Sequence, residues 1–291
     1  MKNKVLVTGS CGFIGHHLVK ELKLRGFYVI GVDNLYGGDK KYADLSDEFL
    51  LKNCGDLTED ELLDVKWIFH LAAIPSIPYS IKNPQQTQKN NVDETLSLLL
   101  LSKKVGIEKF VFSSSSSVYG EQTKFPTDEK CQTIPISPYA VQKLCAEQYC
   151  ETFRKIYGLP TVSLRYFNVY GEEQRADNPY TGVITKFIKL KKQGEPLNIY
   201  GTGLQRRDFT YVGDVVDANI LTAEKGEGVY NVGTGTNISI NELASIISEN
   251  IVHSESKLGD PLLSLANPIK LKELGWNPKM DLMSWLENIK L

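Results

Sequence analysis

The chain has 291 residues and a mass of 32.6 kDa, with 42% hydrophobic and 23% charged residues, which is the composition of an ordinary globular protein. This composition excludes a wholly disordered chain, a collagen-like repeat and a small disulfide-stapled domain. The formal net charge is -2 and the isoelectric point about 6.1, so there is no overall basic field to hold a nucleic-acid backbone or an anionic membrane surface. We therefore expect neither nucleic acid nor a membrane as a partner.

The cysteines and the apolar runs bear on the cellular compartment. The cysteines are odd in number and form no Cys-x-x-Cys pair, which argues against a disulfide framework and a structural zinc site: Cys11, Cys54, Cys131, Cys145 and Cys150. The apolar run 5–7 near the N-terminus is too short for a signal peptide, and the run 98–101 is too short to span a bilayer. We expect a cytoplasmic protein.

Strand-like and helix-like segments alternate through the first 170 or so residues. Short β-branched runs predict strands at 5–7, 28–32, 67–71, 110–112 and 161–164, and apolar residues of helical period predict helices at 13–25, 58–64, 85–105 and 137–157. Such alternation predicts parallel strands joined by right-handed crossovers, with helices on both faces. The predicted fold class is therefore a doubly wound α/β, or Rossmann, sheet.

The pattern changes in the Pro/Gly/Asn-rich stretch 171–182, after which the elements are shorter. There we predict helices at 182–193, 214–224, 240–251 and 268–274, and strands at 197–200 and 229–232. We assign residues 1–171 to the Rossmann domain. Residues 172–291 form a smaller C-terminal lobe in this interpretation, with some return of the chain to the first domain.

A glycine-rich turn, Thr8-Gly-Ser-Cys-Gly-Phe-Ile-Gly15, follows the first predicted strand and precedes the first helix. Gly9 permits a tight turn, Gly12 lets the backbone approach a pyrophosphate, and Gly15 lets helix and strand pack closely. The helix N-terminus offers free N–H groups to the anion. The turn predicts a dinucleotide site, with a purely structural tight turn as the alternative.

Carboxylates near the ends of predicted strands supply the next part of this site. Asp33, followed by Asn34, ends the second predicted strand 18 residues after Gly15, where a carboxylate accepts hydrogen bonds from ribose hydroxyls. It would also repel a 2′-phosphate, so NAD is favoured over NADP. We place Asp56 and Leu57 at the end of the third strand, near the adenine. The alternatives are helix-capping or turn roles for Asp33 and Asp56.

A tyrosine and a lysine four residues apart open the predicted helix 137–157. Tyr139 and Lys143 share one helix face, and a nearby ammonium group stabilises a phenolate. Moving the pKa of a tyrosine from about 10 toward neutrality takes roughly 4 kcal/mol, which Lys143, the positive charge of an oxidised nicotinamide and a hydroxyl donor could supply together. The run Ser113–Ser117 ends a predicted parallel strand, where open α/β sheets bind ligands, so one of its hydroxyls should face Tyr139. The other serines would satisfy loop backbone groups.

Short motifs in chain order carry a resemblance to a known family. They are Thr8-Gly9-x-x-Gly12-Phe13-Ile14-Gly15, His70-Leu71-Ala72-Ala73, Asn91-Val92, Ser115-x-x-x-Tyr119-Gly120, Tyr139-x-x-x-Lys143 and Arg165-Tyr166-Phe167-Asn168. In combination they resemble the extended short-chain dehydrogenases/reductases, specifically the NAD-dependent nucleotide-sugar epimerases and dehydratases. The resemblance covers nearly the whole chain. It implies NAD as the cofactor and a nucleotide-diphosphate sugar as the substrate.

The resemblance also implies roles for individual residues. Ser115, Tyr139 and Lys143 would be the catalytic triad. Besides the residues named above, the cofactor would contact Phe13, Ile14, Leu71, Ala72, Ala73, Asn91, Tyr139, Lys143, Tyr166 and Val169. The substrate would contact Ser115, Asn168, Arg207, Lys257, Asp260 and Ser264. Arg207 would grip the diphosphate, whereas Lys257 stands where the family usually has the arginine of Arg-x-Gly-Asp, ending here at Asp260. The small Ser264 would leave room beside C2 of the sugar for an N-acetyl group.

The implied reaction is C4 epimerisation through a transient 4-keto sugar, on a UDP-hexose or a UDP-N-acetylhexosamine. A 4,6-dehydratase is disfavoured because Ser116 and Ser117 stand where that branch has an Asp-Glu pair. Another C4 oxidoreductase and a non-catalytic NAD-sensing protein are the remaining alternatives. The resemblance also suggests a homodimer in which helices 85–105 and 137–157 pair with their copies, although their apolar faces could instead be buried within one chain.

Overall fold

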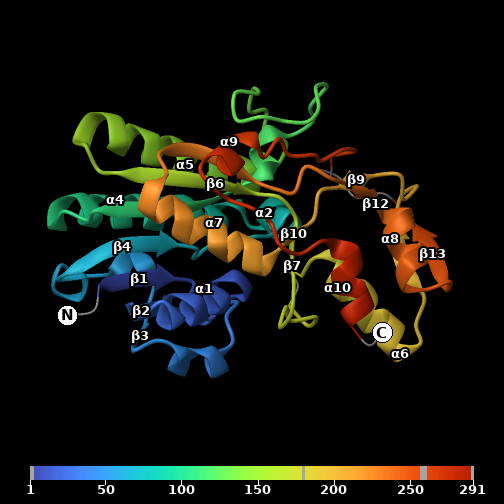
Figure 1. Cartoon of the computed structure of the whole chain (residues 1–291), viewed down its shortest axis with the longest axis horizontal. Helices are drawn as coiled ribbons and strands as arrows, with labels where there is room; N and C mark the ends of the chain where they lie inside the picture. The colour runs from blue at the N-terminus through green and yellow to red at the C-terminus, as the bar shows by residue number, and fades with distance from the viewer. Residues whose placement is uncertain (1–2, 179–180, 256–260, 290–291) are drawn as a thin grey trace.

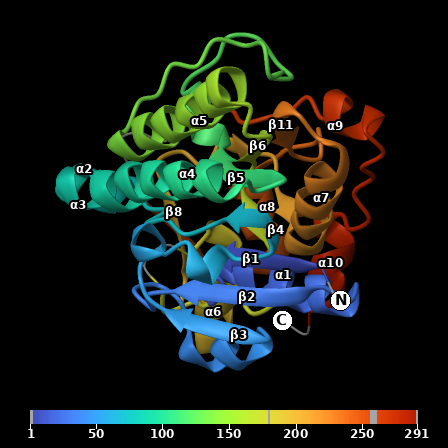
Figure 2. The ribbon, with the colours of Figure 1, turned by 90° about the vertical axis from the view of Figure 1, so that its left-hand side faces the viewer.

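The computed structural model describes residues 3–178, 181–255 and 261–289. Within these residues a parallel sheet of seven strands has the order β11-β6-β5-β4-β1-β2-β3. The strands are β1 (Lys4–Thr8), β2 (Tyr28–Asp33), β3 (Glu48–Leu51), β4 (Val65–His70), β5 (Lys109–Ser115), β6 (Thr161–Tyr166) and β11 (Gly228–Val232). Figure 2 shows this order from β3 at the bottom to β11 near the top. The predicted doubly wound sheet is confirmed.

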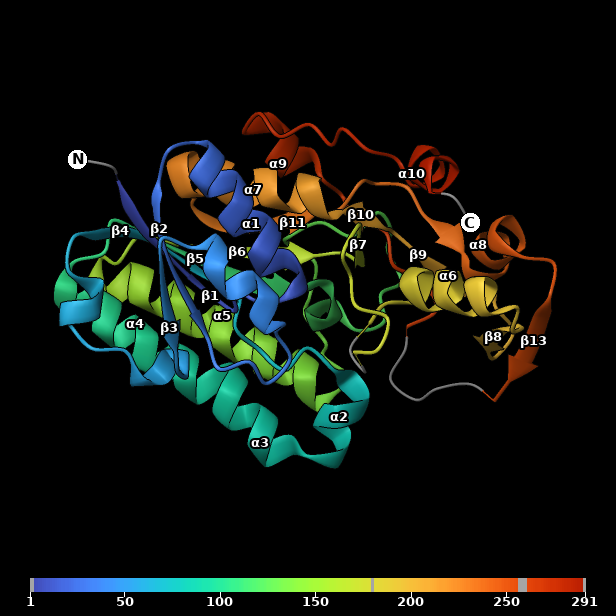
Figure 3. The same cartoon turned by 90° about the horizontal axis from the view of Figure 1, so that it is seen from below.

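Helices cover both faces of the sheet (Figure 3). On one side lie α1 (Phe13–Leu24), α7 (Val212–Lys225) and α9 (Ile269–Glu273), and on the other lie α4 (Glu94–Val105) and α5 (Pro138–Tyr157). Successive side chains of a strand point to opposite faces, so the strands contribute to an apolar core on each face of the sheet. In β1, Val5 and Val7 pack in the core of α1 and α7, whereas Leu6 packs in the core of α4 and α5.

Connections between the strands hold shorter elements. These are the 3-10 turns η1 (Lys40–Leu45), η2 (Cys54–Asp56), η3 (Asp60–Leu62) and η5 (Ser116–Tyr119), the helices α2 (Ile77–Lys82) and α3 (Pro84–Gln88), and the π-helical turn η4 (Lys89–Asp93). Two predictions fail here. The predicted helix 58–64 is only the turn η3, and the third strand is Glu48–Leu51, so Asp56 and Leu57 do not end it. This half-exposed edge strand carries too little apolar alternation to be recognised.

The smaller lobe lies beyond the carboxyl ends of the large sheet, at the right of Figure 1. Its elements are β7 (Val169–Tyr170), α6 (Val183–Gln193), β8 (Leu197–Tyr200), β9 (Arg206–Arg207), β10 (Thr210–Tyr211), β12 (Ile238–Ser239), α8 (Ile240–Ile247), β13 (Ile251–Ser254) and α10 (Leu282–Asn288). The predicted helix 240–251 is too long, because the chain turns after Ile247 and pairs β13 with β8. Phe187, Leu243 and Trp285 lie in the lobe's own core.

The chain returns from this lobe to the large sheet. The strand 229–232, predicted for the smaller lobe, is instead β11 of the large sheet and pairs in parallel with β6. Helix α7 packs in the same core through Val215 and Ala218. Local sequence could not assign β11 because a short apolar strand suits either core. The division at residues 171 and 172 stays a prediction.

No helix in the described ranges is long and apolar enough to cross a membrane. The cysteines all lie in these ranges and are free thiols, which agrees with the absence of a disulfide framework expected from their number. Cys11, Cys54 and Cys150 are buried.

Candidate active site

The glycine-rich turn joins β1 to α1 in a conformation that side chains would disrupt. Gly9 has φ +68°, and a Cβ on it would lie 2.8 Å from the Ala72 nitrogen. A Cβ on Gly15 would lie 2.0 Å from the Gly9 carbonyl oxygen, so only glycine allows this close packing of helix on turn. The N-cap residue Gly12 provides no side-chain cap, which leaves the first N–H groups of α1 available to an anion. These features fit the pyrophosphate of a dinucleotide.

Asp33 ends β2 beside this turn. Its Oδ2 accepts a hydrogen bond from the Cys11 backbone N–H at 3.0 Å, and its Oδ1 accepts one from the Leu35 N–H at 2.7 Å. Burial raises the pKa of the Asp33 carboxyl, while these two hydrogen bonds act to lower it. The carboxylate thus braces the loop, as the alternative interpretation expected, and it also lines the pocket.

A cavity of about 800 Å³ runs from the glycine turn to the smaller lobe, a size typical of ligand pockets. Most of the predicted site residues line it. They are Gly9, Gly12, Phe13, Ile14, Gly15, Asp33, Asn34, Leu71, Ala72, Ala73, Ser115, Tyr139, Lys143, Tyr166, Asn168, Val169, Arg207 and Ser264. The fold therefore brings the predicted cofactor residues and several predicted substrate residues around one space.

Three predicted cofactor residues lie outside the lining of this cavity. Asp56 accepts a hydrogen bond from the Asn53 amide, and Leu57 is buried. Asn91 is also buried, and its Oδ1 accepts from the Ile74 N–H at 2.8 Å, so it braces the lining loop from behind. Cofactor contacts of these three residues stay predictions. Lys257 and Asp260 lie outside the described residues.

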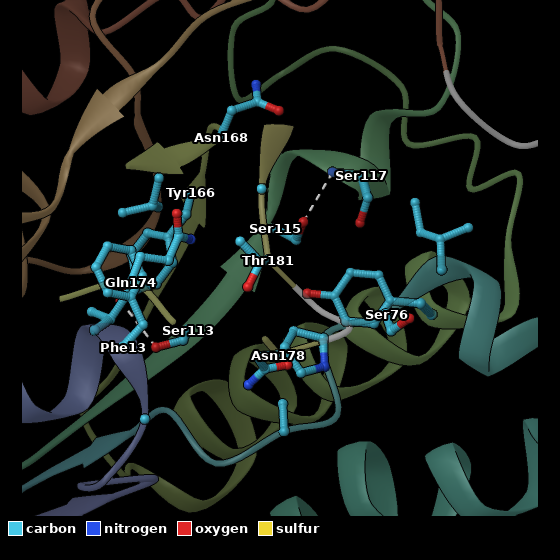
Figure 4. A pocket seen from close by; sticks show the side chains of 18 of the residues that line it. Phe13, Ser76, Ser113, Ser115, Ser117, Tyr166, Asn168, Gln174, Asn178 and Thr181 are labelled. Carbon is cyan, nitrogen blue, oxygen red and sulfur yellow. Dashed lines mark hydrogen bonds between the residues drawn. The ribbon is translucent and has the colours of Figure 1, made fainter. Parts of the chain in front are cut away.

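The strand end of β5 and the first turn of α5 bring the predicted triad together. The Ser115 hydroxyl accepts a hydrogen bond from the Ser117 N–H at 3.2 Å, drawn in Figure 4, and it lines the same cavity as Tyr139. Ser137 caps α5 by accepting from the Ala140 N–H. This cap sets the helix start, and hence the position of Tyr139 relative to β5. The Lys143 ammonium group donates to the Ser113 carbonyl oxygen at 2.8 Å.

Burial dominates the electrostatics of Tyr139 and Lys143. Burial raises the pKa of Tyr139 to about 12, although the hydrogen bond with Ser115 acts to lower it. Burial also lowers the pKa of Lys143 to about 8. Among the protein's own groups, desolvation dominates the pKa of Tyr139. The joint acidification by Lys143, a nicotinamide charge and a hydroxyl donor stays a prediction. Any phenolate at neutral pH needs further positive charge in the cavity.

The smaller lobe contributes the opposite wall. Arg207, on β9, is 7% exposed, and its guanidinium donates to the Arg206 carbonyl oxygen at 2.8 Å. Asn168 has φ +27° and donates from its side-chain amide to the Asp208 carbonyl oxygen at 2.8 Å. The Asp208 N–H donates to the Ser264 carbonyl oxygen. This backbone pairing holds Ser264 beside β9.

Further lining residues were not predicted. Gln174, Arg175 and Asn178 come from the segment that the sequence marked only as a Pro/Gly/Asn-rich boundary, and Gln174 and Asn178 are seen in Figure 4. Ser117 also lines the cavity, and its buried hydroxyl has no hydrogen-bond partner among the described residues. The serine run signalled Ser117, whereas no periodic pattern places a loop such as 174–178.

Comparison with known proteins identifies the family. The model of the "NAD dependent epimerase/dehydratase family" matches residues 5–233. The chain belongs to this family. A putative UDP-glucose 4-epimerase from Methanocaldococcus jannaschii is 36% identical over 302 residues, covering 98% of each chain.

Two solved structures extend the family likeness to three dimensions. A UDP-N-acetylglucosamine 4-epimerase from Methanobrevibacter ruminantium M1 is 39% identical, with a TM-score of 0.92. A UDP-glucose 4-epimerase from Thermotoga maritima is 38% identical, with a TM-score of 0.94. Each alignment covers 98% of this chain and 96% of the other. The family likeness therefore includes the smaller lobe as well as the sheet.

Proposed function

We propose that this protein is an NAD-dependent nucleotide-sugar 4-epimerase that acts through a transient 4-keto sugar on a UDP-hexose or a UDP-N-acetylhexosamine. One observation carries the proposal: Ser115, Tyr139 and Lys143 line the same cavity as the glycine turn and Arg207. A catalytic triad, a dinucleotide cradle and a diphosphate-binding arginine are thus available to one bound pair of ligands. The similar 4-epimerases support this assignment.

The proposed NAD contacts follow from the shape of the glycine-rich turn. Gly9, Gly12 and Gly15 would lie against the NAD pyrophosphate, and Asp33 would accept from the adenosine ribose hydroxyls. Tyr166, Val169 and the loop 71–73 line the same part of the cavity in this assignment. When bound, NAD supplies a hydride acceptor that later returns the hydride, so epimerisation consumes no external oxidant.

The triad handles the proton of the sugar 4-hydroxyl. Tyr139 would receive this proton and return it to the opposite epimer, with Ser115 hydrogen-bonded to the same oxygen. Lys143 would stabilise the phenolate and orient the nicotinamide ribose. Because Tyr139 is a phenol with a raised pKa in the protein alone, the positive charge of the oxidised cofactor is part of what makes it a base.

The substrate is proposed from the smaller lobe. The planar guanidinium of Arg207 suits the oxygens of a diphosphate, and the diphosphate would tether the sugar while its ring turns over. Asn168 would contact the sugar nucleotide, and Ser264 would leave space for a C2 N-acetyl group. Ser116 and Ser117 supply no carboxylates for dehydration, so the proposal ends in epimerisation.

A homodimer and a cytoplasmic location are proposed with this function. Support for the dimer comes from large apolar side chains on neighbouring helices of one sheet face. Leu100 on α4 is 53% exposed and Val141 on α5 is 51% exposed. A partner that covers this face would remove apolar surface from water.

Product analysis tests the proposal. The purified protein is incubated with UDP-glucose, UDP-N-acetylglucosamine, dTDP-glucose or GDP-mannose, and the C4 stereochemistry of the products is determined by NMR. We expect C4 epimers of the UDP-sugars without net NADH formation. Tyr139→Phe should lower the turnover rate by about 10²- to 10⁴-fold, because proton transfer is lost, while the affinity for NAD is retained. Undiminished turnover in this variant would refute the assignment of Tyr139.

A further inference from the structure

Two adjacent glutamates stand where the chain passes from the large sheet to the smaller lobe. Glu172 and Glu173 follow β7, and we call them the carboxylate pair. Both side chains belong to exposed residues, and the triad does not use them. Their contacts nevertheless reach into opposite halves of the molecule.

Glu172 points to the smaller lobe. Its Oε1 accepts a hydrogen bond from the indole N–H of Trp285 at 2.6 Å, and its Oε2 accepts one from the Tyr211 hydroxyl at 2.9 Å. Trp285 lies on α10 and is 4% exposed in the core of the lobe. Glu172 is therefore fixed to a rigid part of that lobe.

Glu173 points instead to the helix that begins at the glycine turn. Its Oε2 accepts from the Lys20 ammonium group at 2.6 Å and lies 2.9 Å from His16 Nε2. The other ring nitrogen of His16 is 2.8 Å from the Gly12 carbonyl oxygen, and its ring stacks on Tyr42 at 3.8 Å. Both of these oxygens are acceptors, and burial lowers the pKa of His16 to about 4, so the neutral ring donates to only one of them. The hydrogen bond from Lys20, on the same helix, ties Glu173 to α1 directly.

The backbone allows the two side chains to diverge. Glu173 has φ +59°, a left-handed conformation that costs a non-glycine residue roughly 1–2 kcal/mol. His17 adds a second tie, because its Nε2 donates to the Glu172 carbonyl oxygen at 3.1 Å. These contacts hold the pair in the left-handed turn.

The chain that follows the pair forms part of the cavity wall. Gln174 and Asn178 line the cavity together with Ser115 and Ser117 (Figure 4). The Asn178 amide donates to the Gly37 carbonyl oxygen at 3.2 Å, in the loop after Asp33. The carboxylate pair and Asn178 therefore fix both ends of segment 174–178 beside the predicted cofactor site.

We propose that Glu172 and Glu173 are positioning residues that couple the cofactor site to the nucleotide-sugar site. Glu173 contacts α1 through Lys20 and His16, and Glu172 contacts the smaller lobe through Trp285. Because the two glutamates are adjacent in the chain, a shift of α1 or of the lobe displaces the other contact as well. Binding at either site then favours the arrangement that the other ligand needs. The inference rests on the proposed function, because it assumes a dinucleotide at α1 and a nucleotide at Arg207.

This role differs from plain structural support. The side chains of Lys20 and Glu173 are 39% and 43% exposed, and ion pairs as exposed as this one contribute about 0–1 kcal/mol to stability. Loss of the Glu173 charge should therefore hardly change the melting temperature. A coupling role predicts a change in how one ligand affects the affinity of the other, which a stabilising role would leave unaltered.

The experiment compares Glu173→Gln and Glu172→Gln with Glu108→Gln. Glu108 is a matched control because its side chain is 59% exposed and, among the described residues, forms an ion pair with Lys66 alone, at 3.6 Å. It lies in the short connection between α4 and β5. The Kd for NAD is measured by calorimetry on cofactor-stripped protein, with and without saturating UDP as the nucleotide probe. For the unaltered protein and Glu108→Gln we expect UDP to tighten NAD binding by about fivefold or more, the low end of measured couplings.

In Glu173→Gln and Glu172→Gln, the ratio of the Kd for NAD without UDP to the Kd with UDP should fall toward one. The melting temperature of Glu173→Gln should stay within about 2 °C of the control. An unchanged ratio in Glu173→Gln overturns the inference, even if Glu172→Gln, next to the buried Trp285, fails to fold. If the unaltered protein epimerises UDP-sugars but shows no coupling, the inference alone fails. If it binds no NAD, the proposed function fails, and the inference with it.

Discussion

At the scale of single residues, the spacing of Tyr139 and Lys143 was enough to place both on one helix face, but not to set their protonation. Spacing reports which side chains are neighbours, whereas a pKa depends on everything that excludes water from them. In the folded chain Tyr139 is desolvated by burial, and Lys143 donates to the Ser113 carbonyl oxygen. Burial raises the pKa of Tyr139 to about 12, so among the protein's own groups the phenol is harder to ionise than a free tyrosine.

Lys143 gives the reaction a predicted alkaline limit. Burial lowers the pKa of its ammonium group to about 8, so above that pH the group loses the charge that would support a phenolate. We expect kcat/KM to fall as the pH rises through about 8. Lys143→Met should lower kcat/KM at every pH and remove this alkaline limb, whereas Lys66→Met, an exposed lysine, should keep it. If kcat/KM of Lys143→Met still falls as the pH rises through about 8, another group causes this fall.

Ser264 gives a prediction on substrate choice. It lines the cavity wall beside β9, and a tyrosine there would fill the space proposed for a C2 N-acetyl group. Ser264→Tyr should lower kcat/KM for UDP-N-acetylglucosamine relative to UDP-glucose by about tenfold or more, the usual penalty for misfit in a pocket. Ser264→Ala, which keeps the space, should leave the ratio unchanged. Equal losses for both substrates in Ser264→Tyr would contradict the assignment.

At the scale of elements, the end of β4 is held by a buried relay of hydroxyls that the motif His70-Leu-Ala-Ala did not reveal. The Thr95 hydroxyl donates to the Asn91 carbonyl oxygen, so His70 Nε2 must donate to Thr95, at 2.8 Å. His70 Nδ1 then accepts from the Thr8 hydroxyl at 2.8 Å, and that hydroxyl accepts from the Ala72 N–H. These hydrogen bonds require a neutral imidazole. They hold the loop after β4 against the end of β1, where the glycine turn begins.

This relay predicts acid sensitivity. Burial lowers the pKa of His70 to about 3, so between about pH 6.5 and 3 the unfolded chain binds a proton that the folded chain does not. The free energy of unfolding should therefore fall below pH 6.5, by up to about 1.4 kcal/mol per pH unit. Urea unfolding at pH 7.5 and 5.5 should show a smaller difference for His70→Asn than for the unaltered protein. The exposed His253→Asn serves as the control and should match the unaltered protein.

At the scale of the whole molecule, α4 and α5 lie on one face of the sheet and expose Leu100 and Val141 to solvent. The smaller lobe cannot cover them, because it lies beyond the carboxyl ends of the strands (Figure 1). In the proposed homodimer, the same face of a second copy, related by a two-fold axis, would cover these side chains. The exposed apolar face is thus the physical basis of the dimer proposal.

The dimer prediction is tested by sedimentation velocity. The unaltered protein should sediment at twice the chain mass of 32.6 kDa, and Leu100→Lys combined with Val141→Lys should shift it to the single chain, because charges would be buried in the interface. Leu24→Lys alters a side chain that is 82% exposed at the end of α1, on the other sheet face, and should remain dimeric. A single-chain mass for the unaltered protein would exclude the dimer.

The sequence by itself determined the alternation that builds the sheet, the glycine turn after β1, the carboxylate at the end of β2, and the helix that carries Tyr139 and Lys143. These depend on neighbours within a few residues, where spacing and turn chemistry act. Only the tertiary structure decided that 229–232 joins the large sheet, that Tyr139 is desolvated, and that Glu172 and Glu173 contact different halves of the molecule. Burial and long-range partners arise from segments far apart in the chain, so no local pattern encodes them.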